Sequence, residues 1–280
     1  TTLSGTSLAI LDSIQKAQVP LVSCAAAIKI VEPAAERRWV FKTPQSDFLI
    51  IGVLTEYLKA KGLTRVGWLH VDYAFGDLGW IEFQKAAPKA GLQVVASEKF
   101  GQRDVDTTPQ LTRMKAASPQ AVVVWSIPPS ASIVTKNYRD LGITAPLFQS
   151  HGVGNKRYIE LAGPAANGVV FPAGKLLVAE QLPDSDPQKP VLLAYAKAFE
   201  AKYGPRNTFG GHAWDALQLV FRAMEKAGAD RAGIREVIEN TRNFVGITGV
   251  FDFSPTDHNG LDRRAVTMIQ IVDGQWRPAK

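Results

Sequence analysis

The chain has 280 residues, enough for two domains with separate cores, and its 46% hydrophobic and 21% charged residues are ordinary for a folded globular protein. The formal net charge of +6 comes from scattered lysines and arginines, which argues against a nucleic-acid binder and favours attraction of anionic solutes. The single cysteine, Cys24, excludes an intramolecular disulfide, and no apolar run approaches the ~20 residues of a membrane-spanning helix.

Up to residue 171 the chain alternates predicted helices with short β-branched strands. The helix–strand pairs, in chain order, are 7–18 with 19–23, 47–61 with 65–70, 77–90 with 92–96, 107–117 with 121–125, 130–141 with 146–148, and 155–162 with 168–171. Such repeats predict parallel sheets that are buried on both faces. The remainder predicts helices at 190–203, 212–227 and 231–241, then closing strands at 249–253 and 265–272.

The sequence carries no strong signature of catalysis. It has no phosphate-binding glycine loop, no nucleophile elbow and no metal-binding histidine spacing. Cys24 fits a small core residue better than a nucleophile. Asp104 and Asp106 favour a solvated loop over a catalytic pair, and Asp184 and Asp186 favour a solvated turn over a calcium loop. We therefore predict no catalytic residue, no metal, no cofactor and no enzymatic activity.

The predicted strands end in small polar and aromatic residues. Ligands of open parallel sheets lie beyond the carboxyl ends of the strands. Here those ends are 23–25, 70–73, 125–127, 149–151 and 172–174. Their composition is typical of a pocket for a small solute.

Seven stretches, in colinear order over nearly the whole chain, resemble leucine/isoleucine/valine-binding proteins. They are residues 4–9, 19–23, 41–44, 72–76, 151–155, 208–216 and 244–253. The resemblance implies a type I periplasmic binding protein, in which two doubly wound parallel-sheet α/β lobes are joined by three crossovers. Lobe I is expected at 1–43 and 175–247, and lobe II at 44–174 and 248–280.

The resemblance also implies hinges and further structure. The crossovers near Thr43, Gly174 and Thr248 would be the hinges of a ligand-driven closure. Family members have further strand–helix units of lobe I before the position of Thr1, so we expect on the order of 70 residues of this lobe to be missing from the chain.

Ligand positions in lobe I follow from the resemblance. Ser4 matches the hydroxyl that binds the ligand carboxylate, and Ala25 matches a backbone contact. Ala27 stands where the family has a threonine, so that only its backbone N–H remains. His212 is expected either to reach the ligand or to serve as a helix cap or surface residue, and Trp214 is expected in the core.

In lobe II, Phe75 stands where a tyrosine is usual, and Ile127 stands where another pocket aromatic is usual. Phe75, Tyr73 and, as a further candidate, Trp125 predict an aromatic or bulky apolar tail on the ligand.

His151 stands where amino-acid binders carry the acid that pairs with the ligand's ammonium. An unpaired buried charge costs several kcal/mol, and a histidine cannot pair with an ammonium, although it can donate to a carbonyl or carboxylate. The sequence therefore favours an aromatic or keto acid over an amino acid. The alternative is that His151 points away and another acid, such as Asp72, takes this role.

We therefore predict a monomeric, periplasmic solute-binding subunit of an ABC importer, with a small carboxylate and the membrane permease as its partners. Attachment by a lipid is left open. The alternatives are a branched-chain or other amino-acid binder, and a sensory ligand-binding module of the same fold. Nucleic acid is not expected as a partner.

Overall fold

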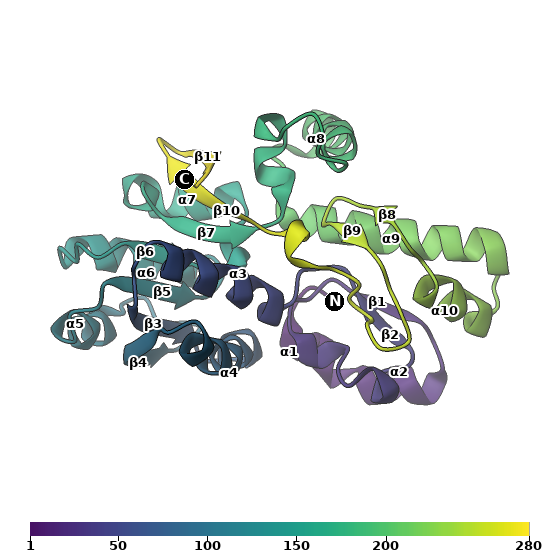
Figure 1. Ribbon diagram of the computed structural model, residues 1–280, viewed down its shortest axis with the longest axis horizontal. Helices are drawn as coiled ribbons and strands as arrows, with labels where there is room; N and C mark the ends of the chain where they lie inside the picture. The colour runs from purple at the N-terminus through teal and green to yellow at the C-terminus, as the bar shows by residue number, and fades with distance from the viewer. Residues whose placement is uncertain (280) are drawn as a thin grey trace. The chain divides into compact units, whose positions relative to one another are not determined.

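A computed structural model, in which residues 1–279 are described, divides into two compact units (Figure 1). Unit 1 comprises Thr1–Asp47 and Gly174–Val266. Unit 2 comprises Phe48–Ala173 and the residues from Thr267 onward. The chain passes from one unit to the other after Asp47, Ala173 and Val266.

Unit 2 is built on one mixed sheet, in which the described residues form seven strands in the order β11-β10-β7-β6-β5-β3-β4. The strands are β3 (Arg65–Val71), β4 (Gln93–Phe100), β5 (Ala121–Trp125), β6 (Leu147–Gln149), β7 (Val170–Ala173), β10 (Thr267–Val272) and β11 (Gln275–Pro278). The strands β3 to β7 pair in parallel, whereas β10 pairs antiparallel with β7 and with β11. The predicted α/β fold with a mostly parallel sheet is confirmed.

Helices precede or connect the parallel strands of unit 2. They are α3 (Asp47–Ala60), α4 (Ala74–Lys89), α5 (Thr108–Ala116), α6 (Ser130–Asp140) and α7 (Lys156–Ala162), with short 3-10 turns η3 (His151–Val153) and η4 (Gly163–Ala166). Every residue of β5 is buried, as expected for a central strand covered on both faces. The strand order reverses between β3 and β5, and this is the point where open α/β sheets bind ligands.

Unit 1 contains a small parallel sheet of β1 (Leu21–Ser23) and β2 (Val40–Lys42) and a hairpin of β8 (Phe244–Val245) and β9 (Val250–Phe251). Its helices are α1 (Ser4–Ala9), α2 (Leu11–Ala17), α8 (Lys189–Tyr203), α9 (Thr208–Ala227) and α10 (Arg231–Glu239). Short 3-10 segments complete it: η1 (Ile28–Ile30), η2 (Ala34–Glu36), η5 (Lys175–Gln181) and η6 (Arg263–Ala265). Phe41 of β2, Leu219 of α9 and Phe251 of β9 belong to one buried apolar cluster.

Residues 248–266 lie with unit 1, whereas the sequence placed them in the other lobe. The reason is a set of contacts with β2. The Lys42 N–H donates to the His258 carbonyl oxygen at 3.1 Å, and the Phe41 and Phe253 rings meet edge to face at 5.8 Å. The third passage of the chain therefore follows Val266 rather than Thr248.

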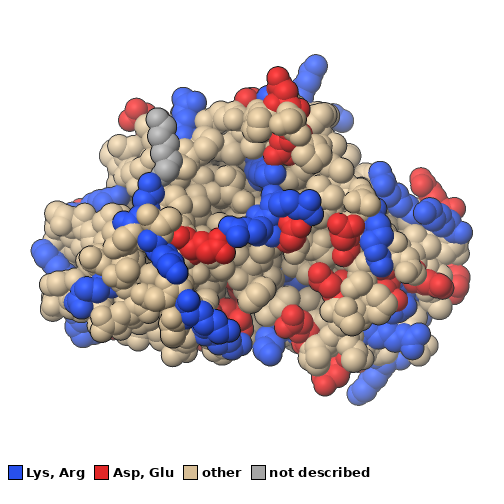
Figure 2. Space-filling model, viewed as in Figure 1, with Lys and Arg blue, Asp and Glu red and all other residues tan. Residues whose placement is uncertain are grey.

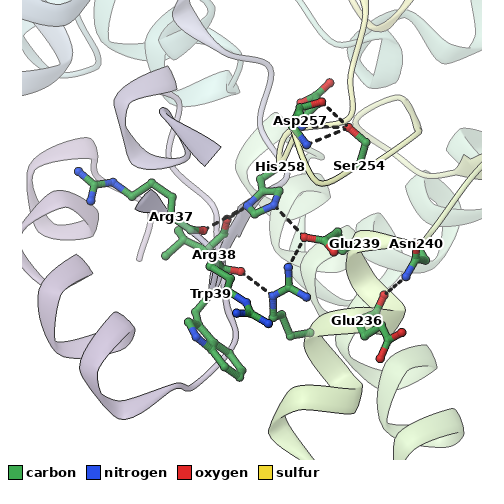
Figure 3. A network of polar contacts seen from close by, with 12 residues as sticks. Arg37, Arg38, Trp39, Glu236, Glu239, Asn240, Ser254, Asp257 and His258 are labelled. Atoms are coloured by element: carbon green, nitrogen blue, oxygen red, sulfur yellow. Dashed lines mark hydrogen bonds and ion pairs between the residues drawn. The ribbon is translucent and has the colours of Figure 1, made fainter. Parts of the chain in front are cut away.

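A polar network around His258 reinforces this attachment (Figure 3). His258 Nδ1 lies 2.9 Å from the Val40 carbonyl oxygen, and Nε2 lies 3.3 Å from Glu239 Oε1. Glu239 also pairs with Arg235, whose Nε donates to the Arg38 carbonyl oxygen at 2.9 Å. Both ring nitrogens of His258 therefore face an acceptor oxygen, one from β2 and one from α10, so the ring links these two elements.

Two helices of unit 1 differ from their predicted bounds. The predicted helix 7–18 is two helices that meet at Ile10. Helix α9 begins at Thr208 rather than residue 212, because the Asn207 side chain accepts the Gly210 N–H at 2.8 Å and caps the first turn. The prediction that Trp214 is a core residue is wrong, because 46% of this α9 residue is exposed.

The lysines and arginines are scattered along the sequence, and no patch of one sign follows from it. On the face that Figure 2 shows, basic and acidic side chains are interspersed. Within residues 1–279, none of the helices has both the length and the apolar character of a bilayer-spanning segment.

Candidate functional site

In unit 1, Ser4 and Ala27 lie together although they are far apart in the sequence. Ser4 begins α1 and is buried, and its Oγ accepts the Ala27 N–H at 3.3 Å. The Ser4 hydroxyl hydrogen can then point toward a further acceptor, such as a carboxylate oxygen. The Ala27 N–H was expected to contact the ligand, and the Ser4 hydroxyl was expected to bind the ligand carboxylate. In the structure this N–H donates to this hydroxyl.

Two further serines surround this position, and the sequence analysis missed both. Ser7 Oγ and Ser23 Oγ are 2.8 Å apart, and Ser23 Oγ accepts the Ala25 N–H at 3.2 Å. Both serines are completely buried. The available signals were the spacing of Ser4 and Ser7, which is nearly one helical turn, and the place of Ser23 at the end of β1. We call Ser4, Ser7 and Ser23 the hydroxyl cluster.

His212 lies in a separate polar chain of unit 1. Its Nδ1 is 3.1 Å from Thr248 Oγ1, and its carbonyl oxygen accepts from Thr43 Oγ1 at 2.8 Å. The Thr43 N–H donates to the Ser23 carbonyl oxygen at 3.0 Å, which joins this chain to the hydroxyl cluster. His212 is thus buried in a hydrogen-bonded structure on α9, and it is neither a helix cap nor a surface residue.

Behind Thr248 lies the buried carboxylate of Asp215. It accepts the Ile247 N–H at 2.8 Å and the Thr248 N–H at 2.7 Å. Burial raises the pKa of Asp215 to about 6, although these hydrogen bonds and the Thr248 hydroxyl act in the opposite direction. Thr248 thus binds Asp215 through its backbone N–H, while its hydroxyl lies 3.1 Å from His212 Nδ1.

In unit 2, Phe75, Trp125 and His151 come from three different elements and meet as rings. The centroids are 5.7 Å apart for Phe75 and Trp125, 5.6 Å for Trp125 and His151, and 5.5 Å for Phe75 and His151. Trp125 is completely buried, and Phe75 and His151 are each 7% exposed. We call these three residues the ring cluster. It lies at the carboxyl end of β5, next to the reversal in strand order.

The other predicted residues of unit 2 adjoin the ring cluster. Ile127 packs beside Gly152, the residue after His151, because its Cγ2 atom is 2.6 Å from where a Cβ on Gly152 would stand. The Tyr73 ring is 6.4 Å from that of Phe75. Burial raises the pKa of Tyr73 to about 12, and its hydroxyl has no hydrogen-bond partner among the described residues. The structure thus brings together Phe75, Ile127, His151 and Tyr73.

The alternative acid, Asp72, already has a cation beside it. Lys99 Nζ lies 2.7 Å from Asp72 Oδ1 and 2.8 Å from Asp77 Oδ1. His70 Nε2 is 3.5 Å from Asp77 Oδ1, and burial lowers the pKa of His70 more than Asp77 raises it. An ammonium at Asp72 would therefore compete with Lys99.

The family model described as "Periplasmic binding protein" matches residues 1–275. The chain belongs to the periplasmic binding protein family. Among curated relatives, it is 26% identical over 198 residues to a leucine-, isoleucine-, valine-, threonine- and alanine-binding protein of Pseudomonas aeruginosa. It is 23% identical over 220 residues to a Leu/Ile/Val-binding protein homologue of Brucella melitensis. The matches cover 70% and 78% of this chain but 48% and 57% of the relatives, so it spans about half their length.

Solved structures of the periplasmic binding protein fold superpose closely on this one. An extracellular ligand-binding receptor from Rhodopseudomonas palustris has a TM-score of 0.93 at 30% identity, covering 99% of this periplasmic binding protein and 80% of its own chain. A branched-chain amino-acid transporter substrate-binding protein of Streptococcus pneumoniae, in complex with isoleucine, has a TM-score of 0.86 at 23% identity, covering 100% and 77%. The latter likeness establishes the type I fold alone.

Proposed function

We propose that this chain is an extracytoplasmic solute-binding subunit of an ABC importer and that it captures a small organic carboxylate. The family and the binding proteins named among its relatives support the transport role. The Ser4 hydroxyl supports the choice of a carboxylate, because its oxygen accepts the Ala27 N–H and its own hydrogen is left to donate to a carboxylate oxygen. Its membrane permease would be the macromolecular partner.

We further propose that the solute is an aromatic or keto acid. The ring cluster offers large apolar faces, and His151 contributes an imidazole where an ammonium would need an anion. An imidazole can instead donate to a carbonyl, a hydroxyl or a second carboxylate.

Two other functions have specific support. The relatives from Pseudomonas aeruginosa and Brucella melitensis are named for branched-chain amino acids, which favours an amino-acid ligand. The Rhodopseudomonas palustris structure is described as a ligand-binding receptor, which favours a sensory module. Ligand screening decides the first alternative. The presence of permease and ATPase genes next to this gene would argue against the second.

A thermal-shift screen tests the proposal with a matched pair of variants. Protein freed of bound solute by unfolding and refolding is heated with benzoate, phenylpyruvate, 4-methyl-2-oxopentanoate or leucine. A ligand at 100 times its Kd should stabilise the fold by about 2.7 kcal/mol, which gives a shift of several degrees. Ser4→Ala should abolish the shift, whereas Ser13→Ala, an exposed serine of α2, should keep it. Stabilisation by leucine alone would contradict the acid proposal.

A further inference from the structure

The ring cluster is the outer end of a longer stack of rings within unit 2. Phe83 and Trp68 stack at 4.3 Å with 23° between their planes, and Trp68 and Trp125 stack at 5.4 Å with 24°. Trp125 and Phe75 continue the stack at 5.7 Å with 26°. The first three rings are completely buried. The orientation of the Phe75 ring is thus set by rings that lie behind it in the core.

The Trp125 ring contacts both other members of the ring cluster, Phe75 and His151. It stacks on Phe75, which lies in the first turn of α4, and it meets His151 of η3 edge to face with 65° between the planes. Any shift of the indole therefore moves two proposed ligand contacts together. Trp125 itself is completely buried and is placed behind both of them.

The position of the indole depends on Gly79. A Cβ at residue 79 would lie 2.3 Å from Trp125 Nε1 and 2.6 Å from Cδ1 and Cε2, far inside van der Waals contact. Nε1 has no hydrogen-bond partner among residues 1–279, so the ring is held there by shape. Gly79 lies four residues after Phe75 on α4, so helix and indole meet one turn behind the Phe75 ring. A methyl group at residue 79 would therefore force the indole or the helix to shift, which changes the position of the indole relative to Phe75 and His151.

We propose that Gly79 and Trp125 form a positioning pair that sets the spacing of the Phe75 and His151 rings and thereby the preference for planar aromatic acids over aliphatic ones. This inference rests on the proposed function. Neither residue needs to contact the solute. Aromatic ring pairs contribute enough that misplacing one ring should change the affinity for an aromatic ligand roughly 2- to 10-fold.

The test compares Gly79→Ala with Gly52→Ala in the full chain. Gly52 lies in α3 and has open space around its Cβ position, so Gly52→Ala is the same change without a clash. Calorimetric titration gives the Kd for phenylpyruvate and for 4-methyl-2-oxopentanoate. Gly79→Ala should lower the ratio of aromatic to aliphatic affinity roughly 2- to 10-fold, and Gly52→Ala should leave it unchanged. Adding Trp125→Phe to Gly79→Ala should restore part of the ratio, because the smaller ring vacates the clash. Equal losses for both ligands would overturn the proposal.

A second readout needs no ligand. The His151 ring protons lie beside the Trp125 indole, so their NMR shifts report the relative position of the two rings. Gly79→Ala should move these resonances, and Gly52→Ala should not; unchanged resonances in a folded Gly79→Ala protein would overturn the inference. If Gly79→Ala does not fold, Trp125→Phe replaces it, with the same expected change in ratio. If the wild type binds leucine instead of the acids, the proposed ligand class fails, and the NMR result alone decides the positioning claim.

Discussion

Replacing the buried Lys42 with methionine should change how the free energy of unfolding depends on pH. Lys42 ends β2 and is completely buried, and its Nζ donates to the Pro44 carbonyl oxygen at 2.6 Å and to Asn259 Oδ1 at 3.4 Å. These neutral acceptors do not replace the lost water. Burial lowers the pKa of Lys42 to about 7, against the opposing effect of Asp47 and other carboxylates.

The sign and size follow from linkage. Below pH 7 the folded and unfolded chains both hold the Lys42 proton, and the fold bears the full cost of the buried charge. As the pH rises from about 7 toward the ordinary lysine value of 10.5, the folded state releases the proton first and gains stability. One pKa unit corresponds to about 1.4 kcal/mol, so wild type should gain roughly 2–3 kcal/mol between pH 7 and pH 9 from this group.

Urea denaturation followed by circular dichroism at pH 6, 7, 8 and 9 measures this gain. The proteins compared are wild type, Lys42→Met and, as a control, Lys59→Met, which removes an exposed lysine of α3. Other titrating groups are common to these proteins and cancel in the differences. Lys42→Met should lose roughly 2–3 kcal/mol relative to wild type between pH 7 and pH 9, whereas Lys59→Met should not. A constant difference would mean that Lys42 titrates as an ordinary lysine and would refute the reasoning.

Two further predictions concern unit 1. Asp215 has a pKa raised to about 6 from an ordinary 3.8, so its contribution to stability is present below pH 4 and is lost as the pH rises through 6. Asp215→Asn should therefore gain about 3 kcal/mol relative to wild type between pH 4 and pH 6 in urea denaturation; parallel pH profiles would rule this out. Burial raises the pKa of the Cys24 thiol, so maleimide labelling should be slow at pH 7 and should accelerate with pH. Because Cys24 adjoins Ala25, a bound ligand should slow labelling, and a rate unaffected by a ligand that calorimetry shows to be bound would remove Ala25 from the site.

The fold was predictable where local pattern decides it. The run Ala121–Trp125 is apolar throughout and forms a fully buried central strand, as the sequence predicted. The start of α9 was not recovered, because the cap at Asn207 precedes two glycines that suggest a break. The place of residues 248–266 was not recovered either. It depends on His258 and Phe253 meeting β2, which is a contact across more than 200 residues of sequence.

Some residues of the candidate site were also predictable from the sequence, whereas others depend on contacts between distant segments. The resemblance to leucine/isoleucine/valine-binding proteins predicted Phe75 and His151 as ligand contacts, and the structure places their rings 5.5 Å apart. Ser7 was missed because its partner, Ser23, lies on a different element. Gly79 was missed because a helix glycine carries no signal of the indole packed against it, and only the three-dimensional contact with Trp125 shows why a side chain does not fit.

The central claim, that the solute is a carboxylate without an ammonium group, is tested most directly by titrating matched acids. Phenylpyruvate and phenylalanine differ only at the α-carbon, where one carries an oxo group and the other an ammonium, and 4-methyl-2-oxopentanoate and leucine form a second such pair. Because an unpaired buried charge costs several kcal/mol, calorimetry should show at least about ten-fold tighter binding of the oxo acid in the pair that binds. Tighter binding of the amino acid would contradict the account and make an amino-acid binder of this chain.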